Sequence, residues 1–283
     1  MAKILDGNIL SKAIKNEIKA EIERDNLKVG LAVILVGDDP ASHIYVNYKQ
    51  KDCAECGIES SKYILSESAG TDELLSLIDT LNEDSGVNGI LIQQPLPKQI
   101  DLTAANERIN PLKDVDAFRA DNVGRITIGD YTLGSCTPAG VMEMLRREEI
   151  PVSGKECVVV GRSNIVGKPM AMMLLHEHGT VTICHSRTAN LKEVCKRADI
   201  LVAAIGKANF ISAEYVKKGA VVIDVGINRN EDNKLCGDVD FAAVEPLAGY
   251  ITPVPGGVGP MTRAMLMKNT LTAMKLQSEL NKA

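Results

Sequence analysis

Tyr45 and Lys49 stand four residues apart in the stretch ASHIYVNYKQKDCAECGI, residues 41–58. Residues at this spacing share one face of an α-helix, so the ring and the amine would lie one turn apart. A lysine buried beside an aromatic ring loses solvation of its charged form, which lowers its pKa toward neutrality and suits it to acid–base catalysis. A solvated lysine on an exposed helix is the alternative, because the charged residues Lys51 and Asp52 follow directly.

A glycine turn follows an apolar run in the stretch VVVGRSNIVGKPM, residues 158–170. The run ends in Gly161, a second glycine follows at Gly167, and Ser163 stands where dinucleotide-binding turns usually have a middle glycine. A strand, a glycine turn and a helix start direct backbone N–H groups at a phosphate, and Pro169 suits the first helical turn. The stretch therefore predicts a nucleotide-binding turn, with an ordinary strand–helix connection as the alternative.

The polar residues near this turn indicate which nucleotide it takes. The carboxylate that usually holds an adenosine ribose should follow the next apolar run, which ends at residue 184, but Ser186, Arg187 and Thr188 stand there instead. Arg162 can reach the same place from the glycine turn, and guanidinium groups bind phosphate oxygens through paired hydrogen bonds. These residues would bind a 2′-phosphate that an aspartate would repel, so the sequence favours NADP over NAD.

Three further stretches place polar groups or exposed backbone where a ligand could bind. Gln93 ends the apolar run GILIQ, at the carboxyl end of an expected strand, where α/β folds build their sites. Asp114 and Asp116 in KDVDAF would serve either as turn carboxylates or as partners for a guanidine-like heterocycle. The stretch PVPGGVGPMT, residues 253–262, is typical of a rigid loop that a ligand approaches closely. Ordinary turns are the alternative for each of them.

The elements that must position these residues follow an α/β pattern. Short Val- and Ile-rich runs without alternation are typical of strands buried on both faces of a parallel sheet, and stretches with apolar residues at helical spacing separate them. We expect two α/β domains with a cleft between them: residues 1–120, joined by a returning C-terminal helix 262–283, and a Rossmann-type domain, residues 137–261. The expected strands lie at residues 31–37, 62–65, 89–93, 156–161, 180–184, 199–206 and 220–226, and the clearest helices at 71–84 and 137–149.

Composition excludes several other classes of protein. The 283-residue chain is 45% hydrophobic and 24% charged, with a net charge of −5, so it lacks the basic surface of a nucleic-acid-binding protein. The seven cysteines are scattered through apolar runs, which favours free thiols in a reducing compartment over a role for the C-x-x-C pair Cys53 and Cys56. We find no credible metal-ligand cluster, no signal peptide and no membrane span, and we expect a cytoplasmic protein.

The motifs together resemble a known family. YVNYKQK, QQPLP, KDVDAF, GRSNIVGKP and PGGVGPMT, in this order and spacing, look like the bifunctional methylenetetrahydrofolate dehydrogenase/cyclohydrolase family, the FolD family, over residues 5–272. The resemblance implies oxidation of 5,10-methylenetetrahydrofolate with NADP and hydrolysis of the methenyl product to 10-formyltetrahydrofolate, in one-carbon metabolism. It also implies folate substrates and a homodimer. Arg263 departs from the pattern, since relatives more often carry a branched apolar residue there.

The resemblance also implies a role for each matching residue. In the catalytic set, Tyr45 stacks on the aminobenzoyl group, Lys49 is the acid–base group of the cyclohydrolase step, Gln93 orients Lys49, and Asp116 holds the pterin edge. Pro255, Gly256 and Gly257 lie along the folate. The remaining residues contact NADP, with Thr262 near the nicotinamide: Gly161, Arg162, Ser163, Ile165, Ser186, Arg187, Cys136, Thr137, Ile227 and Thr262.

Two other functions compete with this interpretation. One is a different NADP dehydrogenase, such as a hydroxy-acid dehydrogenase with a catalytic Lys–Asp pair; the joint presence of Tyr45, Lys49, Gln93 and Asp116 argues against it. The other is a non-catalytic NADP-binding protein, which predicts the loss of Lys49, and Lys49 is present.

Overall fold

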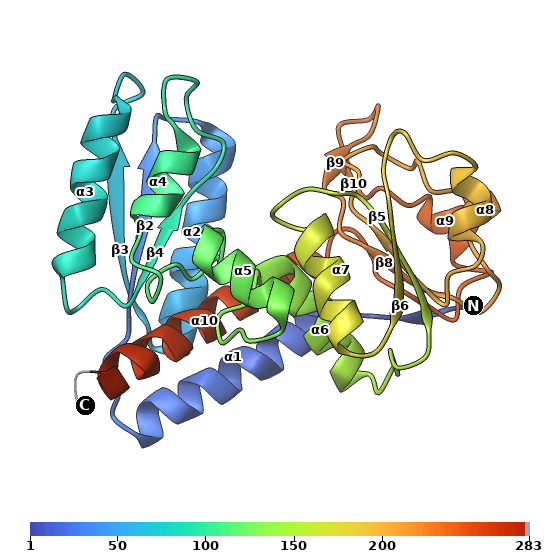
Figure 1. Ribbon diagram of the computed structural model, residues 1–283, viewed down its shortest axis with the longest axis horizontal. Helices are drawn as coiled ribbons and strands as arrows, with labels where there is room; N and C mark the ends of the chain where they lie inside the picture. Colours follow the sequence, from blue (N-terminus) through green and yellow to red (C-terminus); the bar gives the residue numbers. More distant parts are fainter. Residues whose placement is uncertain (281–283) are drawn as a thin grey trace. The chain divides into compact units, whose positions relative to one another are not determined.

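Two α/β units make up the chain in the computed structural model, which describes residues 1–280. The six-stranded unit comprises Met1–Ser11 and Thr137–Thr262, and the three-stranded unit comprises Lys12–Cys136 and the chain from Arg263 onward. All strand pairs of the two main sheets are parallel, which confirms the predicted α/β fold. Figure 1 labels the elements along the chain.

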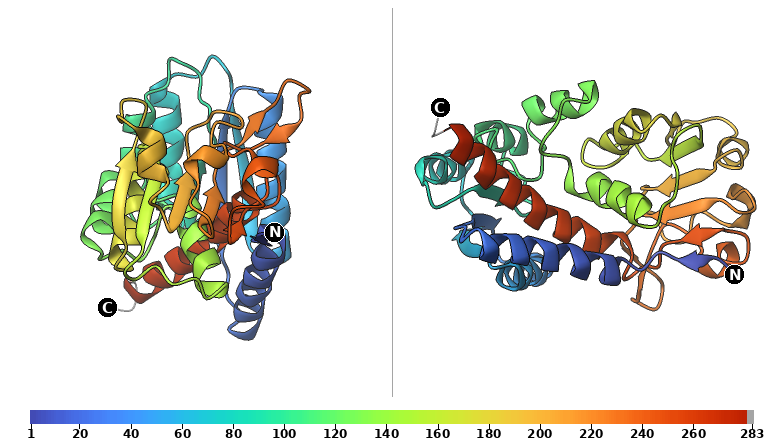
Figure 2. Two further views of the ribbon diagram at one scale, coloured as in Figure 1. Left: turned by 90° about the vertical axis from the view of Figure 1, so that its right-hand side faces the viewer. Right: turned by 90° about the horizontal axis from the view of Figure 1, so that it is seen from below.

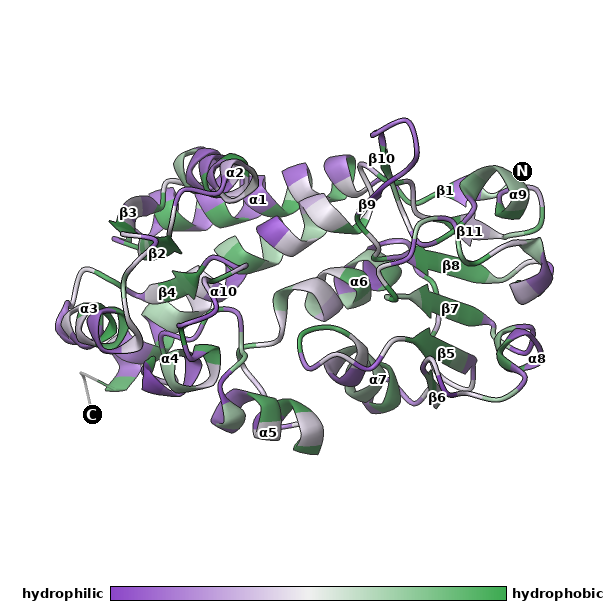
Figure 3. Ribbon diagram, turned by 90° about the horizontal axis from the view of Figure 1, so that it is seen from above, coloured by the Kyte–Doolittle hydropathy of each residue, from purple (hydrophilic) through white to green (hydrophobic). Residues whose placement is uncertain are grey.

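The three-stranded unit has the order β3-β2-β4, with β2 (Gly30–Val36) between β3 (Glu59–Leu65) and β4 (Gly89–Ile92). Every residue of β2 is buried, as expected for a central strand without alternation. Helices α3 (Thr71–Glu83) and α4 (Leu102–Arg108) cover one face of this sheet, and α2 (Pro40–Cys56) covers the other (Figures 1 and 3).

Helix α2 carries the first candidate residues, and its ends are fixed locally. The Asp39 carboxylate accepts a hydrogen bond from the backbone N–H of Ser42 at 2.8 Å and so caps the N-terminus. Gly57 ends the helix in the left-handed conformation, with φ of 78°, which glycine adopts without strain. Tyr45 and Lys49 therefore lie on one continuous helix, as the argument from their spacing requires.

The six-stranded unit has the order β1-β11-β8-β7-β5-β6. Its central strands are hydrophobic, as Figure 3 shows for β8, β7 and β5. Helices α8 and α9 contribute to the core on one face of the sheet. The bounds are β1 Lys3–Ile4, β5 Glu156–Val160, α7 Gly167–His176, β6 Thr180–Cys184, α8 Leu191–Cys195, β7 Ile200–Ala203, a 3-10 helix Ala213–Tyr215, β8 Val221–Asp224, β9 Asn228–Arg229, β10 Leu235–Cys236, α9 Phe241–Val244 and β11 Tyr250–Ile251, with β9 and β10 forming an antiparallel hairpin.

Helices α1 (Gly7–Arg24) and α10 (Val258–Leu280) carry residues of both units and run side by side (Figures 1 and 2). Within the three-stranded unit, Lys275 of α10 pairs with Glu21 of α1. Asn269 of α10 donates hydrogen bonds of 2.8 Å to the carbonyls of Val115 and Gly134. The terminal helix therefore holds the loop that carries Asp114 and Asp116.

The segment between the two sets of strands contains more helix than the sequence predicts. The Gly, Asp and Pro content of residues 110–138 suggests a crossing between domains with a few ordered turns, but the helix α5 (Ala120–Ile128) forms there. The helix expected at residues 137–149 is α6 (Cys136–Arg147), which begins one residue earlier than expected. Only Asn122 and Ile126 of α5 are buried, which leaves too short an apolar stripe to stand out in the sequence. Among the described helices, none is long and apolar enough to cross a lipid bilayer.

Candidate active site and dinucleotide-binding turn

Lys49 and Gln93 are in direct contact in the three-stranded unit. The Lys49 Nζ atom donates a hydrogen bond of 2.9 Å to Gln93 Oε1. The Gln93 backbone N–H donates to the Ile34 carbonyl of the neighbouring strand at 2.8 Å, and its side-chain amide donates to the Gln94 carbonyl. The amide oxygen is therefore held in place to receive the lysine, while Tyr45, 40% exposed, lies one helical turn before Lys49.

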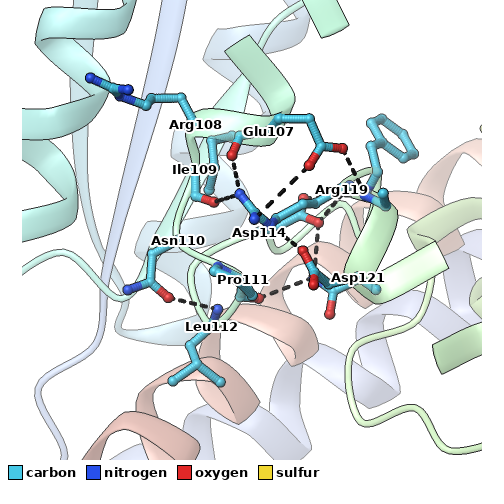
Figure 4. A network of polar contacts seen from close by, with 12 residues as sticks. Glu107, Arg108, Ile109, Asn110, Pro111, Leu112, Asp114, Arg119 and Asp121 are labelled. Atoms are coloured by element: carbon cyan, nitrogen blue, oxygen red, sulfur yellow. Dashed lines mark hydrogen bonds and ion pairs between the residues drawn. The ribbon is translucent and has the colours of Figure 1, made fainter. Parts of the chain in front are cut away.

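The structure separates the two aspartates that the sequence left open. Asp114 is buried, and its carboxylate accepts hydrogen bonds from the backbone N–H groups of Phe118 and Arg119 and from the Asn122 side chain (Figure 4). These donors occupy its oxygens and hold the loop closed. Asp116 is only half-buried and interacts electrostatically with Lys49, so it is the candidate for contact with a ligand.

Burial has the largest effect on the pKa values of Lys49 and Asp116 in this site. Burial lowers the pKa of Lys49, while the Asp116 charge acts in the opposite direction. Burial likewise raises the pKa of Asp116, against the effect of Lys49 and of a hydrogen bond with the Cys136 thiol. A lysine with a lowered pKa loses and regains a proton more readily near neutral pH, which is what an acid–base catalyst requires.

The glycine turn after β5 leaves no room for a side chain at either of its two glycines. Gly161 has φ of 147°, and a Cβ there would lie 2.3 Å from the Ala204 carbonyl oxygen. A Cβ at Gly167 would lie 2.3 Å from the Gly161 carbonyl oxygen. The Ser163 hydroxyl accepts hydrogen bonds from the N–H groups of Val166, at 3.1 Å, and Gly167, at 3.3 Å, so it binds backbone donors where α7 begins. This explains a serine where a middle glycine is usual.

The basic residues expected to bind a 2′-phosphate lie at one edge of the six-stranded sheet. Arg162 follows β5, while Ser186 and Arg187 follow β6, and all three are exposed. Strands β5 and β6 are parallel neighbours, so their carboxyl ends meet at the same edge. Ile165 is also exposed in the glycine turn. The arrangement fits the negatively charged end of NADP.

The remaining predicted cofactor residues are divided between the two units, with Thr137, Ile227 and Thr262 in the six-stranded unit and Cys136 in the three-stranded unit. Thr137 and Thr262 share a hydrogen bond of 3.0 Å between their hydroxyls. Ile227, 53% exposed, follows β8. Cys136 instead belongs to the three-stranded unit, where its thiol donates to the Val115 carbonyl at 3.3 Å.

The loop with Pro255, Gly256 and Gly257 belongs to the six-stranded unit. Gly256 has φ of 104°, and its carbonyl accepts a hydrogen bond of 2.8 Å from the Gly7 N–H. A Cβ at Gly257 would lie 2.5 Å from the Pro253 carbonyl oxygen. The loop therefore packs closely against its own chain, at glycines that larger residues cannot replace without a shift, and its approach to a ligand stays a prediction.

Sequence reasoning missed a pair of buried carboxylates at the carboxyl end of β8. Asp238 is fully buried and accepts hydrogen bonds from the N–H groups of Ile205, Gly206 and Lys207. Asp224 accepts from the N–H groups of Gly226, Asp238 and Val239. The two side chains fix the loops after β7 and β8. The glycines on either side, in DVG and CGD, are the only signal in the sequence.

Asp224 should make stability depend on pH. Burial raises its pKa to about 6, whereas the unfolded chain releases this proton near pH 4. The protonated group therefore favours the folded state fully below about pH 4, and this contribution, about 3 kcal/mol, is lost as the pH rises to about 6. Asp224→Asn should remove that part of the slope in the free energy of unfolding, measured by urea titration from pH 4 to 7.

Asp232→Asn provides the matched control for this titration, because Asp232 is exposed. Its free energy of unfolding should follow the wild-type pH dependence. Equal slopes for the wild type and Asp224→Asn would show that Asp224 is ionised in the folded state at pH 4 to 6.

Comparison with known proteins identifies one family for both parts of the chain. The family model for the tetrahydrofolate dehydrogenase/cyclohydrolase catalytic domain matches residues 5–116, and the model for the NAD(P)-binding domain of the same family matches residues 135–278. A bifunctional protein FolD from Acetivibrio thermocellus is 59% identical over 99% of both chains.

Solved structures give the same result. The FolD enzyme from Campylobacter jejuni is 47% identical, with a TM-score of 0.95, over 98% of this chain and 100% of that one. The FolD enzyme from Trypanosoma brucei, solved with NADP and an inhibitor, is 37% identical, with a TM-score of 0.93, over 98% of both chains. With two family models covering most of its length and relatives this similar, the chain belongs to the tetrahydrofolate dehydrogenase/cyclohydrolase family.

Proposed function

We propose that this protein oxidises 5,10-methylenetetrahydrofolate to the methenyl form with NADP and hydrolyses the methenyl form to 10-formyltetrahydrofolate. The hydrogen bond between Lys49 and Gln93, beside the carboxylate of Asp116, carries the proposal. It places a lysine with a lowered pKa against an oriented amide, as the hydrolytic step requires. Membership in the family supports both activities.

Hydrolysis needs a group that takes a proton from the attacking water and returns one as the ring opens. Neutral Lys49 accepts the first proton at Nζ, and the Gln93 amide oxygen holds the resulting ammonium by a charge-assisted hydrogen bond. The protonated lysine then donates to the folate nitrogen whose bond to the former methenyl carbon breaks, while the hydroxyl proton of the addition product passes to solvent as the formyl C=O bond forms. Asp116 would bind the pterin edge, and Tyr45 would pack against the aminobenzoyl ring.

The oxidation requires alignment more than proton transfer. Bound NADP would supply the hydride acceptor for the methylene carbon, and the folate nitrogens would stabilise the resulting cation. The glycine turn at Gly161 fits a dinucleotide because it joins a strand to the start of a helix, where backbone N–H groups can bind phosphate. Arg162, Ser186 and Arg187 would hold the 2′-phosphate, with Ser163 and Ile165 completing the turn. Cys136, Thr137, Ile227 and Thr262 would line the cofactor site, and Pro255, Gly256 and Gly257 the folate.

A spectroscopic assay tests both activities with one sample. Purified protein is mixed with 5,10-methylenetetrahydrofolate and either NADP or NAD, and methenyl formation and decay are followed. Oxidation that is faster with NADP, followed by enzyme-dependent loss of the methenyl form, is the expected result. Absence of oxidation with either cofactor would contradict the dehydrogenase assignment, and methenyl decay no faster than without enzyme would contradict the cyclohydrolase assignment.

The basis of NADP preference can be tested at Ser186. Ser186→Asp places a carboxylate beside the expected 2′-phosphate, and such like-charge contacts cost several kcal/mol. We expect the ratio of kcat/KM for NADP over NAD to fall at least about 10-fold. Ser153→Asp is the matched control, because Ser153 is exposed before β5, at the opposite end of that strand, and should leave the ratio unchanged. An unchanged ratio in Ser186→Asp would place the 2′-phosphate elsewhere.

Three further proposals follow from family membership. The folate-binding part would comprise residues 1–120 with 262–283, and the NADP-binding part residues 137–261. The protein would act in the cytoplasm as a homodimer. Sedimentation velocity tests the dimer, since a species at the monomer mass of 30.4 kDa across the concentration range would contradict it. Fractionation of the source cells tests the location.

A further inference from the structure

Arg263 lies in the second turn of α10, where the part of the helix that belongs to the three-stranded unit begins. A buried acid, Asp52, anchors its side chain. Its Nε atom donates a hydrogen bond of 2.6 Å to Asp52 Oδ2 on α2, and the Asp52 side chain is 6% exposed. The other oxygen, Oδ1, accepts a hydrogen bond of 2.7 Å from Lys15 on α1. Lys15 also pairs with Glu55. One buried carboxylate thus joins three helices through two cations.

This cluster lies on the same part of α2 as the proposed acid–base group. Asp52 follows Lys49 by three positions, so the two side chains share a helix face. Tyr48 directly precedes Lys49, and the Arg263 guanidinium lies over its ring, 5.2 Å from the centroid. Arg263 therefore contacts α2 on either side of Lys49 in sequence, which fixes the turn that carries the lysine.

The charges around Lys49 come from four parts of the unit. Burial lowers its pKa most; Asp116, from the loop between α4 and α5, and the thiols of Cys136 on α6 and Cys53 on α2 act to raise it. Arg263, from α10, is the cation that acts to lower it. Cys53 and Cys136 remain thiols near neutral pH, because burial raises the pKa of both above the ordinary value. Asp116 and Arg263 are thus the charged groups with the largest effects on Lys49, and Asp52 adds a negative charge about one helical turn away on α2.

We propose that Arg263 is a positioning residue for the cyclohydrolase step, which holds the Tyr48–Asp52 turn of α2 and presents a fixed positive charge to Lys49 that Asp52 partly balances. The inference rests on the proposed function, since it concerns the protonation of Lys49 in hydrolysis. A positive charge nearby disfavours the ammonium form of the lysine and so increases the fraction that can accept a proton. The opposed effects of Arg263 and Asp52 give the proposal its test.

The test compares pH profiles of methenyl hydrolysis by the wild type, Arg263→Gln, Asp52→Asn and the double variant, after subtraction of uncatalysed hydrolysis. Arg263→Gln removes the cation that disfavours the ammonium form of Lys49, so the acid limb of the kcat profile should move to higher pH by about half a unit to one unit. Asp52→Asn removes the carboxylate that partly balances Arg263 and should move the acid limb to lower pH. The double variant should return toward the wild-type position, since it removes both charges. Lys268→Gln, an exposed cation on α10, should leave the limb in place.

Each outcome decides the question. Lower kcat at every pH, with the acid limb unmoved in both single variants, would overturn the proposal and leave Arg263 a structural role only. Arg263→Lys keeps the charge and should keep the limb, so it provides the decisive comparison if Arg263→Gln fails to fold. A wild-type protein that does not hydrolyse the methenyl form would refute the proposed function itself, and this inference with it; wild-type hydrolysis with unshifted variants would refute only the inference.

Discussion

Replacing Lys49 with methionine should abolish methenyl hydrolysis while oxidation of the methylene form continues. A positioned acid–base group contributes about 10²- to 10⁴-fold to a rate, and we expect kcat for hydrolysis to fall within that range. Methionine keeps much of the length and volume of the lysine, so the helix α2 and its packing should persist. Hydride transfer needs no proton from this residue, since the folate nitrogens stabilise the cation that forms. Both rates are measured on one sample by following the methenyl form.

Lys51→Met is the matched control, because Lys51 lies two residues further on the same helix and is exposed. It should retain both activities. Full hydrolysis by Lys49→Met would remove Lys49 from the mechanism, whereas equal loss of oxidation and hydrolysis would indicate a role in binding the folate. The ratio of the two rates therefore carries more information than either rate alone.

The sequence predicts the framework of the fold because buried parallel strands have a strong composition. The run LAVILVG contains β2, and every residue of that strand is buried. Strands of two residues, such as β1 and β11, lack such a run. They form because the sheet already offers a pairing edge, which is a property of the folded chain and not of the local sequence.

The candidate site was predictable where a role depends on local spacing and not where it depends on distant partners. Tyr45 and Lys49 share a helix face by spacing alone. Only the family resemblance distinguished Asp116 from Asp114. Their residue types and spacing could not, because the difference lies in three hydrogen-bond donors at Phe118, Arg119 and Asn122 that only the folded loop brings to Asp114.

The partners of buried charged residues were equally hard to predict from the sequence, because they lie far away along the chain. Asp238 accepts N–H groups from residues more than thirty positions earlier in the chain, so no short motif announces it. Arg263 stands out in the sequence only as an unusual residue beside Thr262. Its partner Asp52 is 211 positions away, and the pair becomes evident only when α2 and α10 pack.

Gly161→Ala should have the largest effect on the oxidation. Alanine at φ of 147° is strained, and its methyl group would lie 2.3 Å from the Ala204 carbonyl oxygen at the end of β7. Strain of this kind costs about 1–3 kcal/mol, and the turn must shift to relieve the contact. The shift moves the backbone N–H groups away from the dinucleotide phosphates, so the Kd for NADP should rise at least about 10-fold. Titration of the protein with NADP, followed by calorimetry, measures this change.

The same substitution should leave hydrolysis of added methenyltetrahydrofolate close to wild type, because Lys49, Gln93 and Asp116 all belong to the three-stranded unit. Retained hydrolysis also shows that the variant is folded, so a loss of NADP binding cannot be attributed to unfolding. Gly124→Ala is the matched control: a Cβ there meets nothing within 4 Å, and Gly124 lies in α5, where alanine is the better helix former. An unchanged Kd in Gly161→Ala would mean that the phosphates bind away from this turn, and the assignment of Arg162 and Ser163 to the cofactor would fall with it.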